Sequence, residues 1–134
     1  MKLNQITEAV IGAAITVHRE LGPGLLESAY EACLAYELED RGFFVERQKE
    51  IPVVYGGAKL DCGFRADLIV EREVIVELKA KECIHPVDEA QLISYLRLLD
   101  FKVGLLINFH VAFLRDGIKR FVNEYIDEKT IDRI

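Results

Sequence analysis

The sequence contains few cysteines, few prolines and no long apolar run. Its three cysteines are far apart and form no Cys-x-x-Cys pair, which argues against a zinc ribbon or a thioredoxin motif. We expect Cys33, Cys62 and Cys83 to be reduced and mostly buried thiols. With only three prolines and no low-complexity tract, the chain does not have the composition of a disordered protein. No apolar stretch reaches the roughly 18 residues that a transmembrane helix needs, so we expect no segment that spans a membrane.

The chain has no excess of positive charge, because 23 Asp and Glu residues outnumber 17 Lys and Arg residues and the formal net charge is -6. A protein that coats nucleic acid draws its affinity from many Lys and Arg contacts to phosphate, so the charge argues against this class. An enzyme that acts on nucleic acid remains compatible with it, since bound cations offset part of the charge of a carboxylate site. Residues 1–10 are too polar to form the apolar core of a signal peptide, and we expect a cytoplasmic protein.

The sequence does have the balance of one globular domain, which we expect to cover residues 1–134, since 51% of the residues are hydrophobic and 30% are charged. Apolar residues at helical spacing predict a helix over 4–21, which ends at Gly22-Pro23-Gly24. A second helix is predicted over 25–41, with Gly42 as its C-cap.

From residue 43 onward the apolar pattern mostly has the period of two that is typical of strands. The predicted elements of this part are, in chain order, strand 43–55 with a break near Pro52, strands 59–64, 67–70 and 74–79, a helix that begins near Pro86, and strands 102–109, 111–114 and 118–122. Asp116-Gly117 predicts a hairpin between the last two strands, and the polar last dozen residues are expected to fray. The order α-α-β-β-β-β-α-β-β-β predicts an α/β fold with a mixed central β-sheet flanked by helices.

Glu77 and Lys79 are the most informative charged residues of the predicted sheet. They lie two apart on a strand and project from the same face of an otherwise apolar segment, where burying charges is costly unless something compensates them. If the loop 71–73 closes a hairpin centred on Arg72, Asp67 lies directly opposite Glu77, with Cβ atoms about 5 Å apart. Two carboxylates at that distance repel each other unless a proton or a cation lies between them, and a divalent metal is the economical explanation.

Two alternatives remain open for these residues. A two-residue loop would place Asp67 and Glu77 on opposite faces of the sheet. Glu77 and Lys79 are also compatible with a surface ion pair on an edge strand. The register of the hairpin and the position of the strand in the sheet decide between these interpretations.

Three further side chains are expected near these carboxylates. Gln91 and Tyr95 are one turn apart on the third predicted helix, which follows the strand of Glu77 directly. A core position for Tyr95 and a solvated position for Gln91 are the alternatives. Glu27 shares a face of the second helix with Tyr30, and its alternative role is to stabilise the helix dipole from the first turn.

The segment from Leu21 to Glu31 resembles the signature of the GxxExxY proteins, with Gly24, Glu27 and Tyr30 at the motif positions. That family is placed in the PD-(D/E)xK nuclease superfamily, and the resemblance extends over most of the chain, from Val17 to Phe109. It implies a restriction-endonuclease-like core and the hydrolysis of phosphodiester bonds, in DNA more than in RNA.

The resemblance also implies a metal site. Asp67 corresponds to the motif aspartate, although Arg65-Ala66 stand where other members often carry a proline. Glu77-Leu78-Lys79 corresponds to the (D/E)xK element, and Glu27 resembles the helical glutamate that can complete the metal shell. The implied ligands of an Mg²⁺ or Mn²⁺ ion are carboxylate oxygens of Asp67, Glu77 and Glu27 and the backbone carbonyl of Leu78.

The remaining catalytic residues follow from the same resemblance. Lys79 is implied to stand beside the attacking water and to stabilise the charge that develops on the phosphate. Gln91 and Tyr95 match the QxxxY element of some members and are implied to position phosphate or bases. Some members hold an iron–sulfur cluster through four cysteines, and with three scattered cysteines we expect no cluster here.

Two other classes of function are compatible with these residues. The chain could be a catalytically silent member that binds nucleic acid or a protein, or an accessory subunit of a larger nucleic-acid-processing assembly. The acidic net charge favours these alternatives, whereas the complete set of motif residues favours the enzyme. Homodimerisation is left open.

Overall fold

The computed structural model describes residues 1–123 of the chain. These residues form three α-helices, one short 3₁₀ helix and seven β-strands. In chain order they are α1 (Leu3–Leu21), α2 (Glu27–Asp40), β1 (Val45–Glu50), β2 (Val53–Tyr55), β3 (Ala58–Leu60), β4 (Arg65–Val70), β5 (Val74–Lys79), α3 (Pro86–Leu99), β6 (Val103–Asn108), the 3₁₀ helix η1 (Leu114–Gly117) and β7 (Ile118–Val122). The predicted fraying at the C-terminus concerns residues outside the described range, apart from Asn123.

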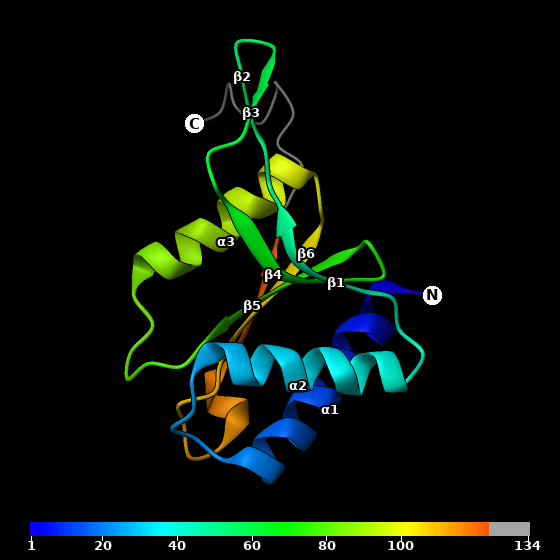
Figure 1. The fold of residues 1–134 in the computed structure, drawn as a ribbon, viewed down its shortest axis with the longest axis vertical. Coiled ribbons are helices and arrows are strands. Elements are labelled where there is room, and N and C mark those ends of the chain that lie inside the picture. The colour runs from blue at the N-terminus through cyan, green and yellow to red at the C-terminus, as the bar shows by residue number, and fades with distance from the viewer. Residues whose placement is uncertain (124–134) are drawn as a thin grey trace.

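Five of the strands form one mixed sheet in the order β1-β4-β5-β6-β7. β5 and β6 run parallel and all other neighbours antiparallel, and β5 lies in the centre of the sheet. Figure 1 shows α1 and α2 on one side of this sheet and α3 on the other. The predicted α/β class, with a mixed central sheet flanked by helices, is confirmed, and the helices and strands follow the predicted order except at the predicted strand 111–114.

Each face of the sheet has its own apolar core, because side chains alternate along the strands. α1 buries its predicted stripe against one face, and α3 covers the other through Leu92, Tyr95 and Leu96. The residues of β5 that pack on the α1 and α2 side are Val74, Val76 and Leu78. Ile75 packs on the α3 side, and the alternation places Glu77 and Lys79 on that same side.

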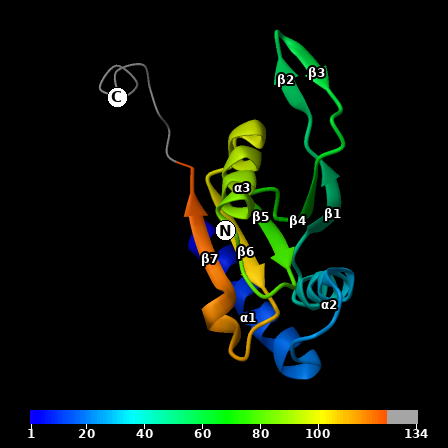
Figure 2. The same ribbon diagram turned by 90° about the vertical axis from the view of Figure 1, so that its left-hand side faces the viewer.

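β2 and β3 form a separate two-stranded sheet that projects beyond α3 as an arm (Figures 1 and 2). The break predicted near Pro52 is the point where the chain leaves the main sheet for this arm. Ile51 is fully buried at the base of the arm, whereas Tyr55 at its tip is 77% exposed. Gly56 and Gly57 both have positive φ angles, 60° and 80°, as a tight hairpin turn requires.

The prediction of a strand over 111–114 is wrong. This segment leads into η1, and β7 pairs with β6 instead, across a longer loop. Asp116-Gly117 is therefore not the turn of a two-residue hairpin. Gly117 is required for space, because a Cβ atom there would lie 2.1 Å from the backbone carbonyl oxygen of Asn108.

The three cysteines are free thiols, as predicted, but the prediction that they are mostly buried is wrong. Cys33 on α2 is half-buried, whereas Cys62 and Cys83 are exposed. Both exposed thiols lie in loops, one after β3 and one before α3, where neither core reaches them.

Candidate active site

The hairpin of β4 and β5 brings Asp67 and Glu77 together. Its register is the predicted one, in which Val70 pairs with Val74, so the alternative with a two-residue loop is wrong. The backbone N–H of Asp67 donates to Oε1 of Glu77 at 3.0 Å, and the backbone N–H of Leu78 donates to Oδ2 of Asp67 at 2.8 Å. The two carboxylates therefore lie side by side on the face of the sheet that α3 covers.

The turn between β4 and β5 fixes this register with an unusual backbone. Glu71 and Arg72 have φ angles of 54° and 56°, in the left-handed region, which costs about 1–2 kcal/mol per residue for a residue other than glycine. Contacts with Phe44 offset part of this cost. The Phe44 N–H donates to Oε1 of Glu71 at 3.0 Å, and the Arg72 guanidinium lies 5.0 Å from the centre of the Phe44 ring.

Glu77 is a buried acid, with 5% of its surface exposed. Burial, and after it the nearby charge of Asp67, raises the pKa of Glu77 to about 8. β5 has a neighbour on each side, so the interpretation of Glu77 and Lys79 as a surface ion pair on an edge strand is wrong. In the absence of a cation, the Glu77 carboxyl holds a proton at neutral pH.

Asp67 is half-buried, and hydrogen bonds fix both of its carboxylate oxygens. Oδ2 accepts from the Leu78 N–H, and Oδ1 accepts from the side-chain amide of Gln48 at 3.2 Å. Burial raises the pKa of Asp67, although both of these hydrogen bonds act in the opposite direction. The site thus holds two carboxyl groups that both resist ionisation without a compensating positive charge.

Lys79 lies on the same face as Glu77, and its ammonium group forms a long ion pair with Asp88 of α3. The distance from Lys79 Nζ to Asp88 Oδ1 is 4.0 Å, and Lys81 Nζ lies 2.5 Å from Asp88 Oδ2. Asp88 also caps α3, since it accepts a hydrogen bond from the His85 N–H at 2.9 Å. Burial raises the pKa of Asp88, but the hydrogen bonds from Lys81 and His85 outweigh it and lower the pKa overall. Asp88 is therefore ionised, with Lys81 as its close partner and Lys79 within its electrostatic field.

α2 approaches the site with two glutamates that are one helical turn apart. Glu31 is buried and accepts hydrogen bonds from Nη2 and Nε of Arg47 at 3.0 and 3.2 Å, and from the Gln48 amide. Glu27 is exposed in the first turn, and within residues 1–123 no hydrogen bond joins it to the site. Partial burial raises the pKa of Glu27, the charge of Lys79 lowers it, and the charge of Asp67 raises it. Glu27 thus lies within the electrostatic field of the site without touching it.

Tyr30 explains the spacing of the predicted motif. Its hydroxyl donates to the Gly22 carbonyl at 2.6 Å and accepts from the Leu25 N–H at 3.1 Å, and its ring stacks on Phe109 at 4.4 Å. These contacts close the loop between α1 and α2. They fix the point at which α2 begins, and with it the position of Glu27.

α3 presents Tyr95 toward the sheet. Tyr95 is 5% exposed, and its ring centre lies 5.9 Å from that of Phe64. Burial raises the pKa of Tyr95, and so do the charges of Glu77 and Asp67. The core position considered for Tyr95 is therefore confirmed, and the same position brings it near both acids. Gln91 is half-buried one turn earlier, and none of the hydrogen bonds among residues 1–123 involves its side chain.

The donors at this site suit a hard divalent cation. Within residues 1–123 no group of three or more His, Cys, Asp or Glu side chains is arranged to hold a metal ion. Mg²⁺ keeps several waters and commonly uses only one or two carboxylates, so Asp67 and Glu77 are a sufficient set of side chains. The N–H and C=O of a strand residue point toward the same neighbouring strand. Because the Leu78 N–H binds Asp67, the Leu78 carbonyl lies on that side too and can serve as a third oxygen ligand.

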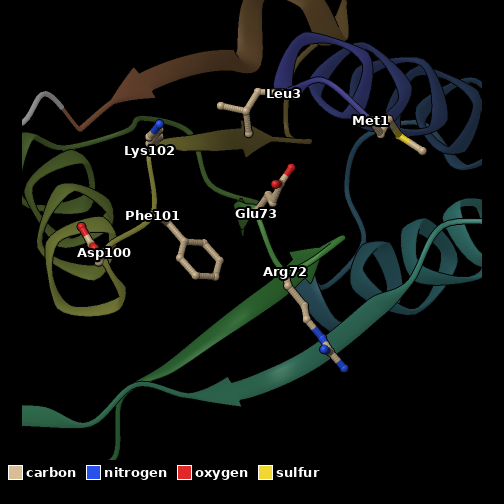
Figure 3. Close-up of a pocket in the computed structure, with 7 residues that line it drawn as sticks. All are labelled: Met1, Leu3, Arg72, Glu73, Asp100, Phe101 and Lys102. Carbon is tan, nitrogen blue, oxygen red and sulfur yellow. The ribbon is translucent and has the colours of Figure 1, made fainter.

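A separate pocket of about 400 Å³ opens at the other end of the sheet (Figure 3). It lies between the start of α1, the turn between β4 and β5, and the loop before β6, with Phe101 in its wall. Asp67, Glu77 and Lys79 do not line it. Figure 3 shows Arg72 pointing away from Phe101, and the remaining charged residues of the lining, Glu73, Asp100 and Lys102, are of both signs.

Sequence reasoning missed three residues that hold the site. Glu31 could have been found, because it follows Glu27 by one helical turn. Asp88 lies in the first turn of α3, and its contact with Lys79 depends on how α3 packs on the sheet, which the sequence does not give. Gln48 gave no signal, because its backbone departs from the strand conformation of its neighbours.

The fold of residues 1–123 is consistent with a PD-(D/E)xK core, and Asp67, Glu77 and Lys79 are the residues that the resemblance assigns to its motif. Residues 4–121 match the family model of the PD-(D/E)XK nuclease superfamily, and the chain belongs to this superfamily. Its nucleases generally use divalent metals such as Mg²⁺. Comparisons with curated proteins and with solved structures give no significant match. Within the described part of the chain, no helix is both long and apolar enough to cross a membrane.

Proposed function

We propose that the protein is a metal-dependent nuclease that hydrolyses phosphodiester bonds at Asp67, Glu77 and Lys79, in DNA rather than RNA. One observation carries this proposal: two hydrogen-bonded carboxylates lie next to a lysine on the central strands of the sheet, and burial raises the pKa of both acids. Such a pair needs a compensating cation when it is ionised. Membership of the superfamily supports nuclease chemistry, and the preference for DNA is an expectation from it.

Each residue of the site has a role in this proposal. Asp67, Glu77 and the Leu78 carbonyl would hold Mg²⁺ or Mn²⁺, with Glu27 completing the shell from α2. When bound, the ion supplies a water of lowered pKa and polarises the scissile phosphate. Lys79 stabilises the negative charge that develops on the phosphate oxygens, and Asp88 keeps its ammonium group at the site. The remaining two residues, Gln91 and Tyr95, would orient the substrate from α3.

The test is cleavage of single-stranded, duplex and branched DNA, and of matched RNA, with Mg²⁺ or Mn²⁺. We expect Lys79→Ala to lower the rate by at least about 100-fold, the usual effect of removing one group that stabilises the transition state. Lys81→Ala is the matched control, since this lysine contacts the same Asp88 but lies outside the (D/E)xK element. It should retain most of the activity.

The other outcomes separate the alternatives. Equal cleavage by wild type and Lys79→Ala would mean that the activity does not come from this site. If Mn²⁺ stabilises the protein against unfolding but no substrate is cleaved, the protein is an accessory subunit that needs a larger assembly. If neither is seen, it is a catalytically silent member. Faster cleavage of RNA than of DNA would reverse the proposed substrate preference.

A further inference from the structure

We propose that Gln48 is a positioning residue of this site, which orients the Asp67 carboxylate and ties it to Glu31 of α2. The inference rests on the proposed metal-dependent function, because it concerns how one ligand of the metal is held. The contacts that carry it come from three elements: α2, β1 and β4.

The first observation is the backbone of Gln48. This residue lies within β1, and its neighbours Arg47 and Lys49 pair with Leu68 and Ala66 of β4 in a regular register. Gln48 itself has a φ of 49°, in the left-handed region that a strand residue other than glycine rarely adopts. Such a conformation persists where surrounding contacts enforce it, and it is often found at functional sites.

The second observation is that the side-chain amide of Gln48 donates hydrogen bonds to two carboxylates. The primary amide of glutamine has two N–H donors. The Gln48 amide nitrogen donates to Oδ1 of Asp67 at 3.2 Å and to Oε1 of Glu31. Both donors therefore serve carboxylates. With Oδ2 of Asp67 held by the Leu78 N–H, the plane of the Asp67 carboxylate is fixed at both oxygens.

The chemistry of an amide suits this position better than that of a charged side chain. A lysine or arginine here would neutralise Asp67 and compete with a metal ion for it, and a glutamate would repel both neighbours. A neutral donor orients the carboxylate and leaves its charge in place. Each carboxylate oxygen has two lone pairs, so one remains on Oδ1 for a metal after the hydrogen bond is made.

The hydrogen bond from Gln48 to Glu31 connects the oriented Asp67 carboxylate to α2. Glu31 is buried, and Arg47 holds its second oxygen through a two-pronged contact at 3.0 and 3.2 Å. The chain of contacts from Arg47 through Glu31 and Gln48 to Asp67 fixes the first turns of α2 against the site. Glu27 lies one turn before Glu31, so Gln48 also sets where that glutamate stands relative to Asp67.

The test replaces Gln48 with glycine, which tolerates the left-handed backbone and lacks the amide. We expect Gln48→Gly to bind Mn²⁺ about 10- to 100-fold more weakly in calorimetry, the usual effect of losing a partner of a metal ligand. Its melting temperature without metal should stay within about 4 °C of the wild type, because the strain is relieved as the hydrogen bonds are lost. A residue with only a structural role would show the opposite pattern, with lower stability and unchanged affinity.

Lys49→Ala is the matched control. Lys49 is the next residue of β1, exposed and ion-paired with Glu46, and its substitution should leave the affinity for Mn²⁺ unchanged. Gln48→Asn should restore little affinity, because the shorter side chain cannot reach both carboxylates. Gln48→Gly with wild-type affinity for Mn²⁺ would overturn the proposal.

A second readout needs no metal and separates this inference from the proposed function. Gln48 is exposed, so only its hydrogen bonds to Asp67 and Glu31 can slow the exchange of its side-chain amide protons with water, and we expect this slower exchange in the NMR spectrum of the metal-free wild type. Asp67→Ala and Glu31→Ala should each speed up this exchange. If the wild type binds no Mn²⁺ but its Gln48 amide is protected, the metal function fails and the orienting role stands. An unprotected amide overturns the orienting role, whatever the wild type binds.

Discussion

At the residue scale, the chemistry of Glu77 depends on what balances its charge. The side chain is almost fully buried beside Asp67, and both circumstances raise its pKa to about 8. Without a cation the carboxyl group holds a proton at neutral pH, and a divalent ion that binds there has to displace it. A proton and a cation are thus alternative partners of the same oxygen atoms.

We expect Glu77 to make the stability of the metal-free protein depend on pH. The pKa is about 8 in the folded protein and near the ordinary 4.5 in the unfolded chain, so the folded state binds the proton more tightly. The stabilisation is complete below pH 4.5 and is lost as the pH rises to about 8. The loss amounts to a few kcal/mol, at about 1.4 kcal/mol for each unit between the two pKa values. Glu77→Gln should remove this slope in urea denaturation followed at several pH values in EDTA.

A matched control for this experiment is Glu82→Gln. Glu82 is an exposed glutamate in the loop before α3, and its substitution should leave the slope of the wild type unchanged. If Glu77→Gln and the wild type have the same pH profile, Glu77 is ionised in the metal-free protein. The proposal that a proton and a cation compete for the Glu77 carboxylate would then be wrong.

At the scale of elements, the connection between β6 and β7 depends on one glycine. A Cβ atom at Gly117 would lie 2.1 Å from the backbone carbonyl oxygen of Asn108. Gly117→Ala should shift η1 or β7 and lower the free energy of unfolding by about 3 kcal/mol, the upper end of the usual range for overpacking. At Gly104 the added atom would meet the end of the buried Leu92 side chain at 2.9 Å, and a side chain can shift where a backbone carbonyl cannot. Gly104→Ala should therefore cost less, about 1 kcal/mol at the lower end of the same range, and chemical denaturation of the two variants compares them directly.

The substitution Gly117→Ala should also lower cleavage at the proposed active site. The Asn108 side chain donates to the Lys81 carbonyl at 2.8 Å and accepts from the Lys81 N–H at 3.2 Å, so it fixes the segment just after Lys79. A shift of Asn108 would move that segment, and cleavage should fall more in Gly117→Ala than in Gly104→Ala. Equal effects of the two variants on stability would contradict the close approach of Gly117 to the backbone carbonyl oxygen of Asn108.

The same elements indicate what the sequence can and cannot predict. The β4–β5 hairpin could be predicted because two apolar strands and a three-residue polar loop fix its register locally, and the register alone sets Asp67 against Glu77. The loop before β7 could not be predicted, because the need for glycine at Gly117 arises from a carbonyl group on another strand. The role of Gln48 could not be predicted either, since its contacts join elements that are distant in the chain. Periodicity reports which face of an element is apolar, and these contacts depend on how the elements meet.

At the scale of the whole molecule, the charge distribution limits how nucleic acid can bind. The net charge is -6, and the cations nearest the site already face carboxylates. Lys79 and Lys81 face Asp88, and Arg47 faces Glu31. The surface around the site therefore offers few unpaired cations for direct contacts to phosphate. Affinity for a substrate then has to come mainly from a bound divalent ion and a few side chains.

We therefore expect an affinity for DNA that depends strongly on the divalent ion and weakly on monovalent salt. Fluorescence anisotropy with the Lys79→Ala variant in Mn²⁺ avoids cleavage during the measurement. Between about 50 and 200 mM NaCl, we expect the logarithm of the association constant to fall with a slope of magnitude below about 3, since each phosphate contact on duplex DNA contributes about 0.9. Replacing Mn²⁺ with EDTA, or adding Glu77→Gln, should remove most of the binding. A steep slope that persists in EDTA would instead mean that the protein binds nucleic acid through a basic surface away from Asp67 and Glu77. It would then favour the catalytically silent binding protein over the nuclease.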